Sequence, residues 1–213
     1  MARQSEMLFP YWSSNIEWFI IGGPARENEA QRIKEKFPDT KCIGFEPNPE
    51  IAYWQRTGTN LFYTDKPFPG QIVECALWDI DYDPLTLSLW NTGSDPCRGS
   101  VCAPAQRPDL DPNSKLWKEY KVEGRTLNSL SKQYGPFHNA ALWLDIEFAE
   151  LKALQGAYEI LKTVQLINLE AYVHLNLSPI VRFLRGYGLY LMDVWGCGPD
   201  PAKDAQDYIF SRR

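Results

Sequence analysis

Residues 16–24 read IEWFIIGGP, an apolar run that stops at a glycine pair followed by proline. A short apolar run closed by turn residues is typical of a buried β-strand. Residues 25–37 then place Ala30, Ile33 and Phe37 at helical spacing among charged side chains, and residues 41–46, KCIGFE, resemble a second strand. Roughly 25 residues separate the two strand ends, which is enough for a parallel crossover. The stretch therefore predicts a strand, a glycine turn, a helix and a parallel strand.

The same alternation continues along the chain. Strands are expected at 72–78, 85–89, 140–146 and 164–169, helices at 50–55, 150–162 and 178–185, and a closing strand pair at 189–194 and 208–210. This order predicts an α/β fold, with a mostly parallel, doubly wound sheet and an antiparallel edge hairpin. We expect a single domain over 1–213, with an N-terminal segment at 1–14 and a long aperiodic loop at 91–114.

Composition narrows the classes of partner. The 213 residues carry a formal net charge of −5 at pH 7, which leaves no global basic footprint for nucleic acid and favours a small or neutral ligand. The odd set of five cysteines is too sparse for a disulfide scaffold. No stretch has the length and apolarity of a membrane span, and residues 1–12 lack a signal-peptide pattern. We therefore expect a soluble cytoplasmic protein without a membrane span, of undetermined oligomeric state.

Two features at the first two strand ends suit an adenosine-containing ligand. Gly22 and Gly23 follow the first strand, where small residues let a ligand approach the backbone, and Glu46 ends the second strand, where an acid accepts hydrogen bonds from a ribose diol. Two plainer interpretations stay open. A glycine pair at a strand end often serves only a turn, and Glu46 is then a solvated strand end.

Acidic residues after the later strands are candidates for proton transfer. Asp145 follows an apolar strand, so partial desolvation is expected to raise its pKa. Glu147, Glu170 and His174 are further candidates, although Glu147 can instead cap the next helix and a lone histidine in a loop is often exposed. Oxygen ligands from Asp145, Glu147 and Glu170 also allow a divalent metal, which the spacing does not require, and we assign no metal ligand.

These motifs resemble the FkbM family of S-adenosylmethionine-dependent O-methyltransferases. The resemblance runs from about Asn15 to Phe210 and is most specific in FEPNP (45–49), DIEFAE (145–150) and LQGA (154–157). It implies a Rossmann-like class I methyltransferase fold and methyl transfer to a hydroxyl, commonly on a sugar or polyketide. The 91–114 loop would then form a lid on the acceptor side.

The resemblance also implies roles for individual residues. Gly22 and Gly23 would lie against the methionine part of S-adenosylmethionine, Glu46 with the adjoining Pro47 would bind near the ribose, and Ala76 and Leu77 would border the adenine. Asp145 would face the methyl-transfer region beside Glu147, with His174 as a third catalytic candidate. The sequence departs from the family pattern at four positions, Ile20, Pro24, Trp143 and Phe148.

Two rival functions remain at this level. The first is a non-catalytic module that binds S-adenosylmethionine or a nucleotide but has lost turnover, as the departures from the family pattern allow. The second is a nicotinamide-dependent oxidoreductase, which the missing third glycine of a G-x-G-x-x-G pattern disfavours. The favoured function is O-methylation of a sugar or glycoconjugate, with a small molecule or glycan as the acceptor.

Overall fold

The computed structural model describes residues 4–25, 29–60, 65–91, 99–102, 115–171, 177–196 and 206–212. Among these residues, seven strands form a central sheet in the order β10-β11-β9-β8-β1-β2-β3. Their bounds are β1 Trp18–Gly22, β2 Lys41–Phe45, β3 Gln71–Val73, β8 Ala140–Leu144, β9 Leu166–Ala171, β10 Leu189–Gly196 and β11 Gln206–Arg212. The pairs from β3 through β9 are parallel, whereas β11 is antiparallel to both β9 and β10. The predicted doubly wound sheet with an antiparallel edge hairpin is confirmed.

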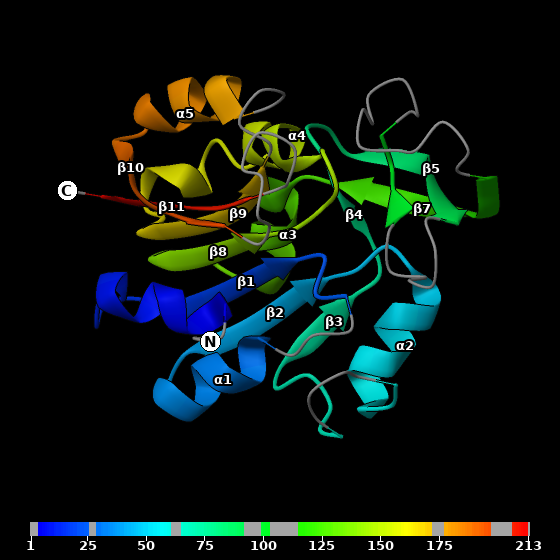
Figure 1. The fold of residues 1–213 in the computed structure, drawn as a ribbon, viewed down its shortest axis with the longest axis horizontal. Helices are drawn as coiled ribbons and strands as arrows, with labels where there is room; N and C mark the ends of the chain where they lie inside the picture. Colours follow the sequence, from blue (N-terminus) through cyan, green and yellow to red (C-terminus); the bar gives the residue numbers. More distant parts are fainter. Residues whose placement is uncertain are drawn as a thin grey trace.

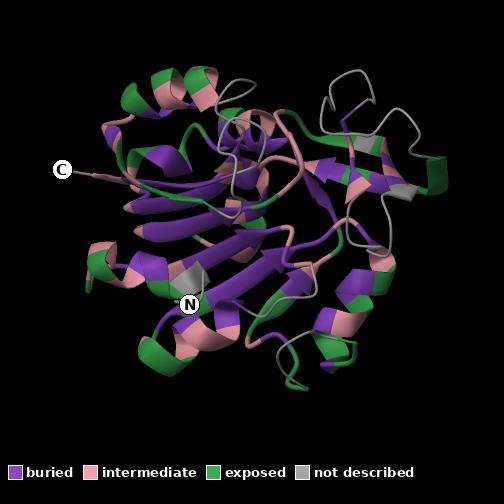
Figure 2. Cartoon of the chain, viewed as in Figure 1, coloured by how far each residue is buried: buried purple, intermediate pink, exposed green. Residues whose placement is uncertain are grey.

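Helices cover both faces of this sheet (Figure 1). On one face, apolar side chains of the 3-10 helix η1 (Gln4–Tyr11), α1 (Glu29–Lys36) and α2 (Pro49–Thr57) share a core with the sheet. On the other face the core includes side chains of α3 (Leu127–Tyr134), α4 (Glu150–Gln155), the 3-10 helix η3 (Ile160–Lys162) and α5 (Leu177–Arg185). Figure 2 shows the central strands almost entirely buried, as expected for a parallel sheet covered on both faces.

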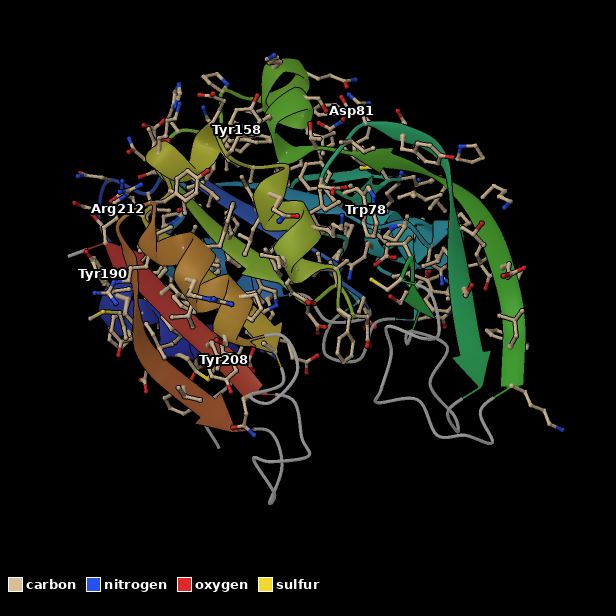
Figure 3. All side chains as sticks on the ribbon, turned by 90° about the horizontal axis from the view of Figure 1, so that it is seen from above. Trp78, Asp81, Tyr158, Tyr190, Tyr208 and Arg212 are labelled. Carbon is tan, nitrogen blue, oxygen red and sulfur yellow. The ribbon has the colours of Figure 1, made fainter. Side chains whose placement is uncertain are left out.

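A second, four-stranded sheet is inserted between β3 and α3. It comprises β4 Ala76–Leu77, β5 Tyr82–Asn91, β6 Gly99–Ser100 and β7 Lys115–Arg125 in the order β4-β7-β5-β6, and has a small apolar core of its own. Strands β5 and β7 run together as a long curved pair away from the central sheet (Figure 3). Asp81, labelled in that figure, accepts hydrogen bonds from the Thr126 N–H (2.7 Å) and the Ser129 hydroxyl (2.8 Å) at the start of α3. These bonds attach the inserted sheet to the helix layer.

Several predicted elements differ from the structure. The strand expected at 72–78 is two strands in different sheets, because a tight turn with Cys75 N–H bonded to the Val73 carbonyl (3.1 Å) diverts the chain. The helix expected over 150–162 ends at Gln155, where Gly156 packs against the Trp78 carbonyl. Strand β7 and helix α3 were not predicted, and β6 lies within the segment 91–114 that was expected to be a loop. Residues 92–98 and 103–114 of that segment lie outside the described residues.

In the part of the chain that the structure describes, no helix combines the length and apolarity needed to span a bilayer. The division into a single domain over 1–213 stays a prediction.

Candidate functional site

The ends of β1, β2 and β8 meet at the carboxyl edge of the central sheet. The Gly23 N–H donates to the Phe45 carbonyl (3.0 Å), and the Asp145 N–H donates to the Gly22 carbonyl (3.1 Å). Gly23 has φ +71°, and a Cβ built on it would lie 2.0 Å from the Asp145 carbonyl oxygen. Any residue with a side chain would therefore disrupt this junction. The glycine turn holds three strand ends together.

An apolar wall adjoins the same turn. Ala76 and Leu77 of β4 are each 3% exposed, and a Cβ added to Gly22 would approach the Leu77 Cδ1 to 2.8 Å. The structure thus brings Leu77, predicted to border the adenine, into contact with the glycine turn. The inserted sheet supplies this wall because β4 leaves the central sheet to pair with β7.

Glu46 directly follows β2 at the same carboxyl edge of the sheet, and it is 5% exposed. Its Oε1 accepts a hydrogen bond from the Asn48 N–H (2.8 Å). Burial raises the pKa of Glu46 to about 7, while hydrogen bonds from the backbone N–H groups of Asn48 and Ala25 oppose that rise. Pro47 is partly buried and leads into α2, whose N-cap is Asn48 and whose first residue is Pro49. The FEPNP motif therefore serves helix initiation as well as positioning Glu46.

A pocket of about 110 Å³ opens between the β1–α1 turn and the end of β8. It is lined by Ile21, Gly23, Pro24, Ala25, Glu29, Trp143 and Asp145. Asp145 is exposed to solvent, whereas Trp143 is buried. Glu29, at the start of α1, forms an ion pair with Arg32 (2.6 Å).

Carboxylates gather around Asp145. Its pKa is raised well above the ordinary value, first by burial among protein atoms and then by the negative charges of Glu170, Glu147, Asp207 and Glu150. Because Asp145 is exposed, the effect of burial on its pKa is weakened, whereas the repulsion from the neighbouring carboxylates still raises the pKa. Asp145 is thus a carboxyl group that exchanges protons nearer neutral pH than an ordinary aspartate does.

The loop after β8 has an unusual backbone. Glu147 and Phe148 have φ +55° and +75°, a conformation that residues with side chains rarely adopt. The Ser100 hydroxyl of β6 donates to the Glu147 carbonyl (2.7 Å) and accepts from the Cys102 N–H (3.0 Å). The inserted sheet is therefore attached to the loop that carries two of the predicted catalytic residues.

Glu147 lies two residues before the N-cap position of α4, and its alternative role at the amino terminus of that helix stays a prediction. The N-cap position of α4 is Ala149, which makes no side-chain capping bond. Glu150 instead accepts from the Ile146 N–H (3.2 Å). The amino terminus of a helix favours nearby acidic side chains, so the sequence alone could not distinguish the role of Glu147 from that of Glu150.

Two features of the site were missed in the sequence. Glu150 is 1% exposed, and burial raises its pKa to about 8. Asn168 of β9 is fully buried and donates through Nδ2 to Asp207 Oδ1 of β11 (2.9 Å). The spacing of Asn168 and Glu170, two apart on a strand, was the available signal that both point to one face. The position of Asp207 depends on β11 lying beside β9, which no local pattern specifies.

Two further expectations from the sequence concern His174 and a divalent metal ion. His174 lies outside the described residues, so its role stays a prediction. Among the residues with described positions, no group of three or more His, Cys, Asp or Glu side chains is arranged to hold a metal ion.

No family model and no curated protein matches the sequence. Among solved structures the chain is similar to a precorrin-6y C5,15-methyltransferase from Geobacter metallireducens, with 10% identity and a TM-score of 0.51 over 98% of this chain and 87% of that one. It also aligns with the antibiotic-resistance methyltransferase Kmr, with 12% identity and a TM-score of 0.41 over 100% and 96% of the two chains.

The first of these likenesses, together with the observed strand order, defines the fold class. This chain has a Rossmann-like class I methyltransferase fold, a mostly parallel sheet with an antiparallel strand near one edge. At 10% identity the likeness shows the fold alone. Membership of the FkbM family stays a prediction.

Proposed function

We propose that this protein is an S-adenosylmethionine-dependent methyltransferase whose acceptor is a hydroxyl of a sugar or glycoconjugate. One observation carries the proposal: the glycine turn, Glu46 and Asp145 occupy the carboxyl ends of the neighbouring strands β1, β2 and β8. Ligands of open α/β sheets bind at this edge. A solved structure that shares the fold is itself a methyltransferase.

The residues at this edge suit the chemical parts of the cofactor. Ala76 and Leu77 offer an apolar wall to the adenine. The Glu46 carboxylate would accept hydrogen bonds from ribose hydroxyls. Gly22 and Gly23 leave room for the methionine end, although the pocket of about 110 Å³ holds only a part of so large a ligand. The carboxylates around Asp145 favour the positive charge of a sulfonium, which supplies the electrophilic methyl group when the cofactor is bound.

We assign to Asp145 the removal of the proton from the acceptor hydroxyl. Methyl transfer to a hydroxyl requires the acceptor oxygen to be aligned with the methyl group and its proton to be removed. The raised pKa of Asp145 makes its carboxylate a better base near neutral pH than an ordinary aspartate. Glu147 adjoins it on the strained loop, and Glu147 and His174 remain candidates for the same task.

The acceptor side is assigned to the inserted sheet. Ser100 attaches β6 to the Asp145–Phe148 loop, and β5 and β7 carry the chain into and out of residues 92–114. An exposed aromatic side chain, Trp117 of β7, is available for stacking on a sugar ring, at 55% exposure. We retain a cytoplasmic location, and an acceptor that is not a nucleic acid, as parts of this proposal.

A transfer assay tests the proposal. The protein is incubated with S-adenosylmethionine labelled in its methyl group and with a panel of sugars and glycans, and label in the acceptor is measured. We expect label in at least one saccharide, strongly reduced transfer with Asp145→Asn at saturating cofactor, and a raised KM for the cofactor with Glu46→Gln. Cofactor binding without label in any acceptor would instead support the non-catalytic binding module.

A further inference from the structure

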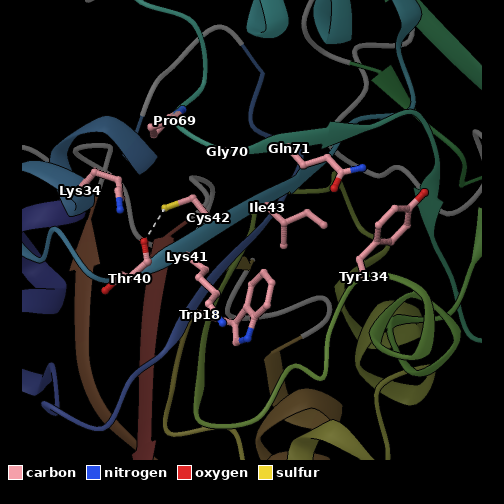
Figure 4. Close-up of a pocket in the computed structure, with 10 residues that line it drawn as sticks. All are labelled: Trp18, Lys34, Thr40, Lys41, Cys42, Ile43, Pro69, Gly70, Gln71 and Tyr134. Atoms are coloured by element: carbon pink, nitrogen blue, oxygen red, sulfur yellow. Dashed lines mark hydrogen bonds between the residues drawn. The ribbon is translucent and has the colours of Figure 1, made fainter.

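A second cavity lies at the opposite, amino-terminal edge of the central sheet. Its volume is about 290 Å³, and it is lined by Trp18, Lys34, Thr40, Lys41, Cys42, Ile43, Pro69, Gly70, Gln71 and Tyr134. Trp18, Lys41 and Gln71 are the first residues of β1, β2 and β3. Figure 4 shows the side chains that line the cavity. Because the candidate methyl-transfer site lies at the carboxyl ends of β1 and β2, the length of these strands separates the two sites.

The cavity has a charge opposite to that of the protein. Its described lining holds two lysines and no carboxylate, in a chain of net charge −5. Burial raises the pKa of the Cys42 thiol to about 12, against the opposing charge of Lys34, so this group adds no negative charge. Such a lining favours an anion.

Lys41 is the cation best placed to meet a ligand. Its ammonium lies 5.2 Å from the centroid of the Trp18 ring and, within the described part of the chain, makes no ion pair. Lys34 is already engaged, because its Nζ donates to the Pro38 carbonyl. Lys41 is exposed, so its charge is also accessible from solvent.

Aromatic rings form one side of the cavity. The Trp18 ring packs edge-on against Phe137, with ring centroids 5.0 Å apart, and Phe137 is fully buried. Tyr134 of α3 lines the same side, as Figure 4 shows, with Ile43 between the two rings. The Tyr134 hydroxyl accepts from Gln133 Nε2 (3.1 Å), which leaves its proton to be donated to a ligand. The Gln71 side chain offers a further amide donor.

We propose that this cavity binds a small organic anion that carries an aromatic ring. The anionic group lies against Lys41 and the ring packs against Trp18, while Gln71 and Tyr134 line the remainder of the cavity. The volume is near the lower limit of about 300 Å³ for ligand pockets, which restricts the ligand to roughly one ring and its charged group. The proposal is independent of the methyltransferase function, because it concerns the other edge of the sheet.

Calorimetric titration with phenyl phosphate tests this site in the full-length protein without any cofactor. We expect saturable binding that is at least about tenfold tighter than that of inorganic phosphate and weakens as salt is raised. Benzyl alcohol, which keeps the ring without the charge, should not bind measurably. Benzoate should bind, because the site recognises charge and ring rather than phosphate itself.

Substitutions assign the binding to this cavity. Lys41→Gln should weaken phenyl phosphate at least about tenfold, and Lys41→Glu should abolish binding. Trp18→Leu should remove the preference for phenyl phosphate over inorganic phosphate. Lys121→Ala on β7, which removes the same charge far from the cavity, should leave affinity unchanged. The proposal is overturned by no binding at millimolar phenyl phosphate, or by equal affinity in folded Lys41→Glu and parent protein.

Discussion

The Ser100 hydroxyl of β6 donates a hydrogen bond of 2.7 Å to the backbone carbonyl of Glu147, 47 residues further along the chain. Ser100 is 2% exposed, so this contact is shielded from water. It joins the inserted sheet to the loop that follows Asp145, and on our account it couples the acceptor side of the site to the proton-accepting side.

Removing this hydroxyl should disturb turnover more than cofactor binding. Ser100→Ala removes the hydrogen bonds that the hydroxyl makes with the Glu147 carbonyl and the Cys102 N–H, and we expect a loss of about 1 kcal/mol in the free energy of unfolding. We also expect kcat for methyl transfer to fall severalfold, with unchanged affinity for S-adenosylhomocysteine. Ser88→Ala is the matched control, because Ser88 pairs with Ser100 in the sheet but its hydroxyl contacts the exposed Glu119 rather than the Glu147 carbonyl. Equal kinetics in the two variants would contradict the coupling.

The Phe148→Gly variant of the protein should be more stable than the Phe148→Ala variant. At φ +75° a residue with a Cβ is strained by about 1–2 kcal/mol, and both substitutions remove the same aromatic ring. Phe148→Gly is therefore expected to unfold at a higher urea concentration than Phe148→Ala. In the interior of a regular helix or strand, alanine is more stabilising than glycine. If Phe148→Ala were the more stable variant, residue 148 would not have the positive φ angle in solution.

The stability of the protein should fall as pH rises from about 5 to about 8. Folding raises the pKa of Glu46 to about 7 and of Glu150 to about 8, above the value of about 4.3 expected in the unfolded chain. In this range the folded protein holds protons that the unfolded chain releases, so each pH increase favours unfolding. Urea titrations at several pH values measure the slope, which Glu150→Gln should reduce. A slope of opposite sign, or one unchanged in that variant, would refute these assignments.

Arg212 should be important for stability although it is the last residue of β11. Its guanidinium donates to three backbone carbonyls, those of Val164 (2.7 Å), Tyr187 (2.9 Å) and Leu161 (2.6 Å). We expect Arg212→Ala to lower the free energy of unfolding by about 3 kcal/mol, because partly buried acceptors lose a charged donor. Thermal denaturation compares it with Arg185→Ala, an exposed arginine of α5. Equal melting temperatures would contradict the role of Arg212.

The central sheet could be predicted because its signals are local. Buried strands such as Ala140–Leu144 are continuous apolar runs, and the glycine pair and prolines mark their ends. Strand β7 was not predicted because its sequence, KLWKEYKVEGR, is mostly exposed and polar, and because its conformation depends on pairing with β5. Helix α3 is only eight residues long, although Thr126 as its N-cap was a readable signal.

The part of the candidate site that lies at the ends of parallel strands could also be predicted from the sequence. Gly22 ends β1, and Glu46 and Asp145 directly follow the parallel strands β2 and β8, so sequence alone indicated that they share an edge. The contributions of Ser100 and Asp207 depend on how β6 meets the β8–α4 loop and how β11 meets β9. Those contacts join segments far apart in the chain, and no periodicity records them.

Binding of S-adenosylhomocysteine, followed by calorimetry on folded protein, tests the central claim most directly. We expect a single site with a dissociation constant below about 100 μM, equivalent to roughly −5.5 kcal/mol. Glu46→Ala should weaken binding at least about tenfold, while Asp145→Asn should retain it. Absence of binding at several hundred micromolar, or equal affinity in Glu46→Ala and the parent protein, would contradict the assignment of this edge as a cofactor site.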